Sequence, residues 1–310
     1  MTRQIKFAIL AAIIGNSIFG FSFMFSRIAL NTATPFVMLM YRFLLAFILL
    51  NGVAFWSARR KKIANTDSND IHWLRFKIEW KNTLPLIAMG VIQPVAYFLC
   101  ESYGISLTNA TFSGVIIALI PIVALGAGIL LLGEYPRKSQ VLFSIISILG
   151  VILMTLQQRA EGAIQFLGVL LLIGAVVTGM AFSVISRKLS AAYSALERTY
   201  VMMLIGAVAF TLLAIIECRN NPAALITPLK DPGFLGAILY LGLFSSIIAF
   251  MCLNYANNYL SVAKATAFCN LTTVISLFAG VIFLHEPFTL ASLIASILII
   301  LGIWGVQRAG

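Results

Sequence analysis

Two glutamates at the ends of long apolar runs are the side chains in this sequence that most resemble a chemical pair. Glu134 follows the apolar part of ILLLGEYP, residues 129–136, and Glu286 stands 152 positions later in VIFLHEPF. Two carboxylates close together could act as general acid and base or relay a proton. Each could instead accept hydrogen bonds from the N–H groups that begin the next helix, because helix N-termini favour anions.

The elements that position these carboxylates are expected to be membrane-spanning helices. The chain is 61% hydrophobic and 10% charged, against about 45–50% apolar and 25% charged residues in soluble domains. A helix needs about 20 apolar residues to cross the hydrocarbon core of a bilayer. The sequence therefore predicts an all-α integral membrane protein with ten transmembrane helices, at 7–26, 35–56, 83–101, 110–132, 138–156, 165–186, 195–216, 233–255, 262–284 and 288–306.

The first stretch is interpreted as a retained span rather than as a cleaved signal peptide. No small-residue cleavage site precedes the polar turn at Asn31, and the apolar run is longer than a signal peptide requires. The four cysteines, at positions 100, 218, 252 and 269, lie in or beside apolar runs without metal-like spacing. We interpret them as small hydrophobes and expect neither a metal site nor a cofactor.

The net charge of +11 is distributed unevenly along the ten stretches. If the N-terminus is cytoplasmic and the spans alternate, the cytoplasmic side receives fifteen Lys and Arg residues and the outer side about four. Cytoplasmic loops are enriched in these residues, so we expect a protein of the cytoplasmic membrane with both termini in the cytoplasm. The basic segment 57–82, either an interfacial segment or a linker, would then face anionic lipid rather than nucleic acid.

The chain carries an internal repeat. A shift of 152 residues aligns segment 97–151 with segment 249–303 without a gap. The identical pairs include polar and small residues as well as apolar ones: Tyr103/Tyr255, Gly128/Gly280, Glu134/Glu286 and Gly150/Gly302. Each unit holds five spans, an odd number, so the second copy enters the membrane upside down. We therefore expect two inverted five-helix repeats, residues 1–157 and 158–310, a plan that recurs in secondary transporters.

This topology separates the two glutamates with which the analysis of chemistry began. Glu134 would lie at the cytoplasmic end of the fourth span and Glu286 at the outer end of the ninth, about a membrane thickness apart. They cannot share a proton. Pro136 and Pro287 suit the first positions of the helices that follow, so we expect each glutamate to hold the N-terminus of the next helix.

Several short segments carry a resemblance to a known family. They are Gly20–Phe23, Pro35, Arg42, Tyr103–Thr111, Pro121 and Glu134 in the first half, and Tyr255–Lys264 and Glu286 in the second. On these residues the chain resembles the drug/metabolite transporter superfamily and, within it, the EamA-type exporters of ten helices. Two positions depart from that pattern. Phe19 stands where a tryptophan is common, and Thr273 stands where the second-half proline would be, so a kink at Pro121 would have no proline partner in the ninth span.

The resemblance implies transport of small organic metabolites, often amino acids or related amphipathic molecules, usually outward. It also implies a cavity lined mainly by spans 1, 3, 4, 6, 8 and 9. The candidate substrate-binding residues are polar positions in these spans: Asn16, Ser17, Gln93, Tyr97, Ser113, Thr178, Lys264 and Asn270. Each of them could instead make a structural hydrogen bond to its own backbone or to a neighbouring helix.

One group of polar residues has helical spacing. Gln93, Tyr97 and Glu101 are separated by four residues each, so a continuous helix would place all three on one face. Such a stripe suits either a wet cavity or hydrogen bonds between helices. Glu101 stands near the outer end of its span and is interpreted as solvated.

Two cations within the spans require a partner or a function. Arg42 could attract a substrate carboxylate, or it could snorkel or bind helix-end carbonyls. Lys264, in the first turn of the ninth span, could meet an anionic substrate or lipid phosphate. No Asp occurs in the ten stretches and no Glu lies near the centre of one. The cations therefore favour substrates that carry a carboxylate, including zwitterions, and the driving force stays open.

The sequence thus predicts a secondary transporter that exports small metabolites by alternating access at a cavity between the two repeats. A facilitative channel or an uptake permease of the same fold is the alternative. No HExxH, GxSxG or P-loop motif appears, so we expect no enzyme activity and no catalytic residue. The expected partners are a small-molecule substrate and membrane lipids, with a monomer as the oligomeric state.

Overall fold

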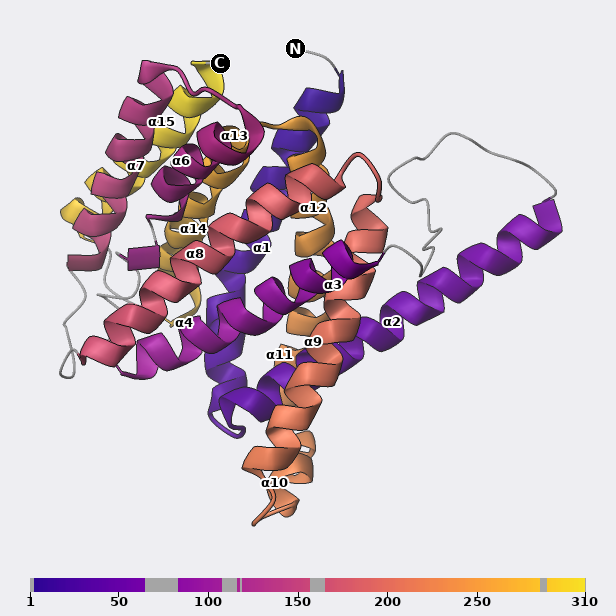
Figure 1. Ribbon diagram of the computed structural model, residues 1–310. Coiled ribbons are helices and arrows are strands. Elements are labelled where there is room, and N and C mark those ends of the chain that lie inside the picture. The colour runs from indigo at the N-terminus through magenta and orange to yellow at the C-terminus, as the bar shows by residue number, and fades with distance from the viewer. Residues whose placement is uncertain are drawn as a thin grey trace.

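The fold is all-helical. The computed structural model describes residues 3–64, 83–107, 116–117, 119–156, 165–284 and 289–309, and every regular element in those ranges is a helix (Figure 1). Eight segments are long and apolar enough to cross a membrane, and two further apolar helices, Ile120–Leu132 and Lys138–Leu153, are shorter. The predicted all-α membrane fold is confirmed, whereas the described ranges contain eight full-length spans rather than ten.

The helices follow one another with short connections. The first half contains α1 (Arg3–Leu30), α2 (Pro35–Ala64), α3 (Leu84–Gly90), η3 (Val91–Ala96), α4 (Tyr97–Ser106), α6 (Ile120–Leu132) and α7 (Lys138–Leu156). The second half contains α8 (Phe166–Leu189), α9 (Ala195–Glu217), α10 (Ala223–Ile226), η4 (Thr227–Lys230), α11 (Pro232–Leu239), η5 (Tyr240–Ala249), α12 (Phe250–Tyr259), α13 (Val262–Ala267), η6 (Phe268–Asn270), α14 (Leu271–Leu284) and α15 (Leu290–Arg308). Both termini lie at one end of the bundle (Figure 1), which we call the terminal face.

Polar residues and one glycine determine where several helices begin and end. Ser194 and Glu197 form a capping box at the start of α9, in which each side chain accepts a hydrogen bond from the other's backbone N–H. Asp231 caps α11 by accepting hydrogen bonds from two backbone N–H groups. Helix α6 ends at Gly133, whose φ of 65° is left-handed, a conformation that glycine adopts without steric cost.

Three membrane-spanning segments are interrupted. In the third span, Gln93 has φ −144° and ψ 121°, and the next residue, Pro94, lacks the N–H that a helix needs. The eighth span contains the π-helix η5, and the ninth contains the 3₁₀ turn η6. Short π-helical segments are rare in proteins and are frequent at functional sites. These interruptions therefore mark the part of the bundle in which to look for a site.

The interruptions fall in the register of the sequence repeat. A shift of 152 residues moves η3 into η5, and it places the start of α6 within one residue of the start of α14. The ninth span is interrupted although Thr273 stands in place of a proline. The missing proline partner of Pro121 therefore does not make the ninth span continuous, because a 3₁₀ turn changes the hydrogen-bond pattern at that point.

Two apolar clusters and one close helix pair hold the bundle together. The larger cluster joins α2, α9, α11 and η5 around the stacked rings of Phe43 and Phe210, 5.4 Å between centroids. The second joins α1, α7, α14 and α15. At the contact of α7 with α15, a Cβ on Gly302 would lie 2.5 Å from Cβ of Ser147 and 2.7 Å from the carbonyl oxygen of Phe143. Glycine allows this approach, as in many membrane helix pairs.

The substitution Gly302→Ala should lower the unfolding midpoint of the purified protein in detergent. The added methyl group overlaps the backbone of α7, and overpacking costs about 1–3 kcal/mol. The matched control is Gly236→Ala in α11, where an added Cβ would meet no atom within 4 Å. Equal midpoints for the two variants would contradict the close packing of α7 against α15.

Candidate functional site

A buried arginine lies where α2 meets the interrupted eighth span. Arg42 is 3% exposed and stands about two turns inside α2. Its Nε donates to Oγ of Ser246 and its Nη2 to Oγ of Ser245, both at 2.8 Å. These acceptors are side-chain hydroxyls of η5, so the side chain points into the bundle and does not bind helix-end carbonyls. Of the interpretations that the sequence left open, the structure disfavours snorkelling.

No carboxylate contacts Arg42 among the residues that the structure describes. The guanidinium lies over the ring of Phe98 at 5.1 Å and over that of Phe43 at 5.5 Å. Hydroxyl groups satisfy its hydrogen bonds but do not neutralise its charge, and an unneutralised charge in an apolar interior is costly. Nη1 has no acceptor within the described ranges. An anion that reached this nitrogen would be strongly attracted.

The hydroxyl groups that hold Arg42 are themselves part of a small polar contact between three helices. The Oγ atoms of Ser22 on α1 and Ser245 on η5 are 2.9 Å apart, and both serines are buried. Tyr240, at the start of η5, donates its hydroxyl to the carbonyl oxygen of Ile18 at 3.1 Å. Helix α1, helix α2 and the π-helical segment therefore meet around the guanidinium.

A tyrosine–glutamate pair lies on α4. The hydroxyl of Tyr97 donates to Oε1 of Glu101 at 2.9 Å, which confirms the shared face that the four-residue spacing predicts. Gln93 is buried, but its extended backbone interrupts the helix, so the stripe does not continue to it. Glu101 is only partly exposed and interacts electrostatically with Arg42. The expectation that Glu101 is simply solvated was wrong.

The two asparagines predicted to line a cavity make hydrogen bonds between helices. Asn16 donates from Nδ2 to the carbonyl oxygen of Ala12 at 2.8 Å, and its own carbonyl oxygen accepts from Oγ1 of Thr272 on α14 at 3.2 Å. Asn270 donates from Nδ2 to Oγ of Ser147 on α7 at 3.0 Å. Both side chains are buried. In this conformation they connect α1 with α14 and η6 with α7.

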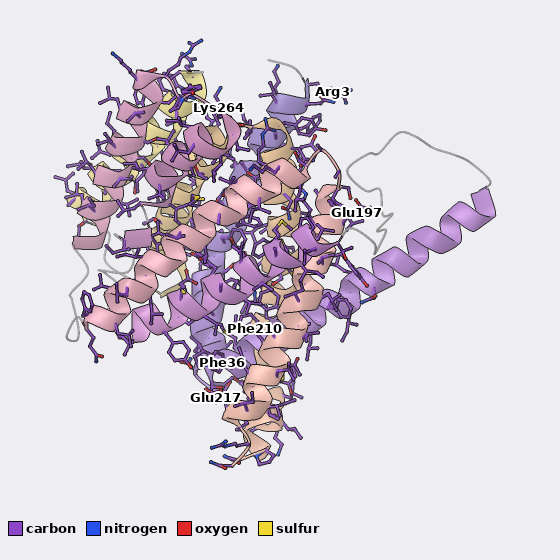
Figure 2. All side chains as sticks on the ribbon, viewed as in Figure 1. Arg3, Phe36, Glu197, Phe210, Glu217 and Lys264 are labelled. Atoms are coloured by element: carbon purple, nitrogen blue, oxygen red, sulfur yellow. The ribbon has the colours of Figure 1, made fainter. Side chains whose placement is uncertain are left out.

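The remaining predicted residues are dispersed. Thr178 donates to the backbone carbonyl oxygen of Gly174 in its own helix at 2.8 Å, and Ser17 is partly buried on α1. Lys264 lies at the terminal face, at the same end as Arg3 (Figure 2). Ser113 lies outside the described residues, as does Glu286. The structure therefore groups Tyr97 with Glu101 near Arg42, and it does not bring Lys264 or Thr178 to them.

A second polar cluster closes the bundle at the terminal face. Oε1 of Glu134 pairs with Nε of Arg187 at 3.2 Å, and Oε2 accepts from the backbone N–H of Val262 at 2.8 Å. Arg187 also donates from Nη1 to the carbonyl oxygens of Asn257, at 3.2 Å, and Asn258, at 2.5 Å. One carboxylate from the first half therefore contacts α8 and α13 of the second half. We call Glu134, Arg187 and Val262 the Glu134 cluster.

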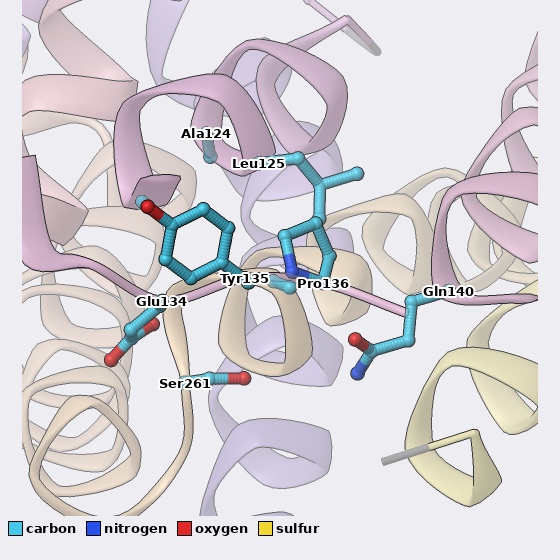
Figure 3. A pocket seen from close by; sticks show the side chains of 9 residues that line it. Ala124, Leu125, Glu134, Tyr135, Pro136, Gln140 and Ser261 are labelled. Carbon is cyan, nitrogen blue, oxygen red and sulfur yellow. The ribbon is translucent and has the colours of Figure 1, made fainter. Parts of the chain in front are cut away.

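The prediction that Glu134 holds the N-terminus of the following helix was wrong in its partner. It binds the start of α13, not the start of α7. Gln140 occupies the latter position, because its Oε1 accepts from the backbone N–H of Arg137 at 2.9 Å. A cavity of about 80 Å³ lies beside the cluster, between Leu125, Tyr135, Gln140 and Ser261 (Figure 3). Ligand sites for small molecules usually exceed about 300 Å³, so this cavity is too small for a metabolite.

The sequence did not single out a third polar group, the network around Arg198. Arg198 is fully buried, and its Nη1 donates to the carbonyl oxygen and to Oγ of Ser186, both at 2.6 Å. Its Nη2 donates to the carbonyl oxygen of Asn254 at 2.8 Å. These bonds tie α8, α9 and α12 together close to the Glu134 cluster. The signal in the sequence was the asparagine-rich end of the eighth span, at 254–258.

Two further signals could have located the interrupted spans. Pro94 stands within an apolar stretch, and Ser245 and Ser246 are adjacent hydroxyl residues in another. Among the residues that the structure covers, no group of three or more His, Cys, Asp or Glu side chains could hold a metal, and all four cysteines are free thiols. The chemistry of the site is therefore that of hydrogen bonds and charge.

Comparisons with known proteins identify relatives over nearly the whole chain. The model of the EamA-like transporter family matches residues 6–156 and again residues 166–308. An uncharacterized transporter of Bacillus subtilis is 28% identical over 301 residues, which cover 96% of this chain and 92% of that protein. An uncharacterized transporter of Archaeoglobus fulgidus is 27% identical over 249 residues, 80% of this chain and 86% of that protein. A solved crystal structure superimposes with a TM-score of 0.77 at 17% identity, covering 97% of this chain and 96% of that one, which shows a shared fold.

The double substitution of Ser245→Ala and Ser246→Ala should lower the unfolding midpoint, because it leaves Arg42 without acceptors. A buried unsatisfied donor costs about 1–3 kcal/mol, and a charged one more. Adding Arg42→Met in the same background should restore part of the loss, since both partners are then apolar. The control is Ser276→Ala, whose hydroxyl bonds only to its own helix. A triple variant no more stable than the double variant would contradict the assigned role of the serines.

Proposed function

The chain belongs to the EamA-like transporter family, and we propose that it is a secondary transporter that exports small organic metabolites, amino acids or related amphipathic compounds, by alternating access. The family match and the apolar helices establish an integral membrane transporter. The substrate class, the direction and the mechanism are our proposal. The observation that carries the substrate class is the buried guanidinium of Arg42, which no carboxylate contacts among the described residues.

The orientation is proposed from the distribution of charge. Lys and Arg residues flank the helix ends at the terminal face, as at Arg137, Lys138, Arg187 and Lys188. Cytoplasmic loops of membrane proteins are enriched in these residues. We therefore assign the terminal face to the cytoplasm of a cytoplasmic-membrane protein, and substrate would enter from that side during export.

The chemistry of Arg42 supports a substrate that carries a carboxylate. A guanidinium presents several N–H donors in a planar fork that matches a carboxylate, and two of its nitrogens already bind Ser245 and Ser246. A carboxylate at the remaining nitrogen would neutralise the buried charge and replace lost hydration. Gln93 and Tyr97, in the interrupted third span, are the proposed lining residues nearest to this group. Asn16 and Asn270 would join them only in a conformation that breaks their present hydrogen bonds between helices.

Contacts between the two halves support alternating access. Arg42 links α2 of the first half to η5 of the second, and the Glu134 cluster links the halves at the terminal face. The ion pair of that cluster is partly exposed, with side chains 30% and 24% accessible. Such pairs contribute about 0–1 kcal/mol, which suits a contact that opens and closes in each cycle. We propose that the Glu134 cluster holds the cytoplasmic side closed in this conformation.

The substitution Arg42→Gln should reduce transport of carboxylate-bearing substrates about tenfold or more, because a hydrogen bond to a charged group contributes about 1.5–3 kcal/mol. The assay is exchange in proteoliposomes with a panel of amino acids, amines and sugars, and Arg308→Gln at the exposed end of α15 is the control. A wild-type protein that moves carboxylate-free amines and ignores amino acids would contradict the proposal. Exchange without acceleration by substrate on the opposite side would favour a facilitative channel, and strictly inward accumulation an uptake permease.

The substitution Glu134→Gln should open the cytoplasmic side more often. In a cysteine-free background that carries Ser261→Cys beside the cavity, a membrane-impermeant maleimide added from that side should react about tenfold faster, as expected for the loss of about 1.4 kcal/mol. Glu217→Gln, at the opposite end of α9 (Figure 2), is the control. Unchanged labelling in Glu134→Gln would remove the cluster from the closing mechanism.

A further inference from the structure

We infer that Glu101 recognises the positively charged group of the substrate, so that Arg42 and Glu101 are the two poles of a site for a zwitterion. The inference rests on the proposed function and adds to it a specificity-determining residue. It starts from the relation between two side chains of opposite charge that stand in adjacent spans of the first half.

The two groups interact without forming an ion pair. Arg42 and Glu101 influence each other electrostatically, yet the structure records no contact between them within 4 Å. Opposite charges inside a membrane protein normally pair directly, because the apolar surroundings strengthen their attraction. Here each is held by neutral partners instead: Arg42 by the two serines of η5 and Glu101 by the hydroxyl of Tyr97.

Each group also keeps one atom without a partner. Within the described ranges, Nη1 of Arg42 has no acceptor, and Oε2 of Glu101 has no donor. A carboxylate accepts hydrogen bonds at both oxygens, and a guanidinium donates from all three nitrogens. The pair therefore offers one free cationic donor and one free anionic acceptor. An α-amino acid supplies the matching carboxylate and ammonium.

The backbone places both free atoms on the same side of α4. Phe98 carries the ring over which the Arg42 guanidinium lies, and Glu101 follows it by three residues, so ring and carboxylate lie on neighbouring positions of one helix face. Aromatic faces attract cations as well. A substrate ammonium next to Glu101 would therefore meet the same aromatic surface, formed by Phe98 and Tyr97, whose ring centroids are 5.5 Å apart.

Charge balance favours a zwitterion over a singly charged ligand. Arg42 is the one charged side chain in the described part of the chain that interacts with Glu101, besides the neutral Tyr97. A zwitterion would complete both poles and leave the site neutral. A carboxylic acid without an amine would satisfy Arg42 but leave Glu101 unpaired, and an amine without a carboxylate would do the reverse. Unpaired buried charges are costly, so both analogues should bind more weakly.

The anchors of the two poles belong to different halves of the molecule. Arg42 is fixed by Ser245 and Ser246 of the second half, whereas Glu101 is fixed by Tyr97 of the first. A zwitterion between them would make one connected set of hydrogen bonds from η5 to α4. Substrate binding would thereby favour one relative position of the halves, and a ligand shifts such an equilibrium only through a difference in affinity.

The test measures binding selectivity in detergent, from the rise in unfolding midpoint with ligand concentration. The probes are the amino acid that the wild-type protein exchanges fastest in the panel above, with L-leucine as the example, its deaminated acid 4-methylpentanoate, and its decarboxylated amine 3-methylbutylamine. The wild-type protein should bind leucine about tenfold or more tightly than either analogue, since each analogue lacks one hydrogen bond between charged groups.

The variant Glu101→Gln should weaken leucine binding about tenfold while leaving 4-methylpentanoate unchanged, so that the two bind equally. Arg42→Gln should do the same for leucine and 3-methylbutylamine. Glu101→Asp, which keeps the charge, should restore part of the preference for leucine. Tyr97→Phe should lower it moderately, because the phenol only orients Glu101, and Glu217→Gln should not change it.

The outcomes separate the inference from the proposed function. If the wild-type protein exchanges no amino acid of the panel, the proposed function itself fails. If it exchanges amino acids and Glu101→Gln retains the full preference for leucine over 4-methylpentanoate, Glu101 does not read the ammonium group and the inference is overturned. A variant that loses both ligands equally, without recovery in Glu101→Asp, would assign Glu101 a structural role and would overturn it as well.

Discussion

The constraint on which the rest of this structure depends is a guanidinium in an apolar interior. Arg42 is buried among helices α2, α4 and η5, with hydroxyl groups and aromatic rings around it and no carboxylate in contact among the described residues. Burial of a charge requires hydrogen bonds and a neutralising partner. The serines of η5 supply the first requirement, and the proposed substrate supplies the second. The interrupted helices make such a site possible, because irregular backbone in a membrane protein is tolerated where it is buried in protein or lines a cavity.

Two cross-half contacts divide the work that alternating access requires. The contact at Arg42 lies inside the bundle and involves fully buried partners, so it is costly to leave unsatisfied. The Glu134 cluster lies at the terminal face, is partly exposed, and is correspondingly weak. A transporter needs strong contacts where substrate is recognised and weaker ones where the protein must open. The network of Arg198, which joins α8, α9 and α12, keeps the second half rigid beside the weak contact.

Much of this architecture could be predicted from the sequence, and the limits have physical causes. Hydropathy located the helices because the bilayer imposes a length, and the 152-residue repeat predicted the register in which η3 and η5 occur. The spacing of Tyr97 and Glu101 predicted their hydrogen bond, because helical neighbours are local. The partner of Glu134 could not be predicted, since Val262 is 128 residues away. The same holds for Arg42, whose acceptors come from the other half, and for Asn16, whose partner Thr272 is 256 residues away.

The most direct test of the central claim is a structure of the protein determined with a transported amino acid bound. The account predicts that the ligand carboxylate lies within hydrogen-bond distance of Nη1 of Arg42, while Ser245 and Ser246 keep their bonds to the same side chain. A ligand density elsewhere in the bundle, with Arg42 bound only to the two serines as it is now, would contradict it.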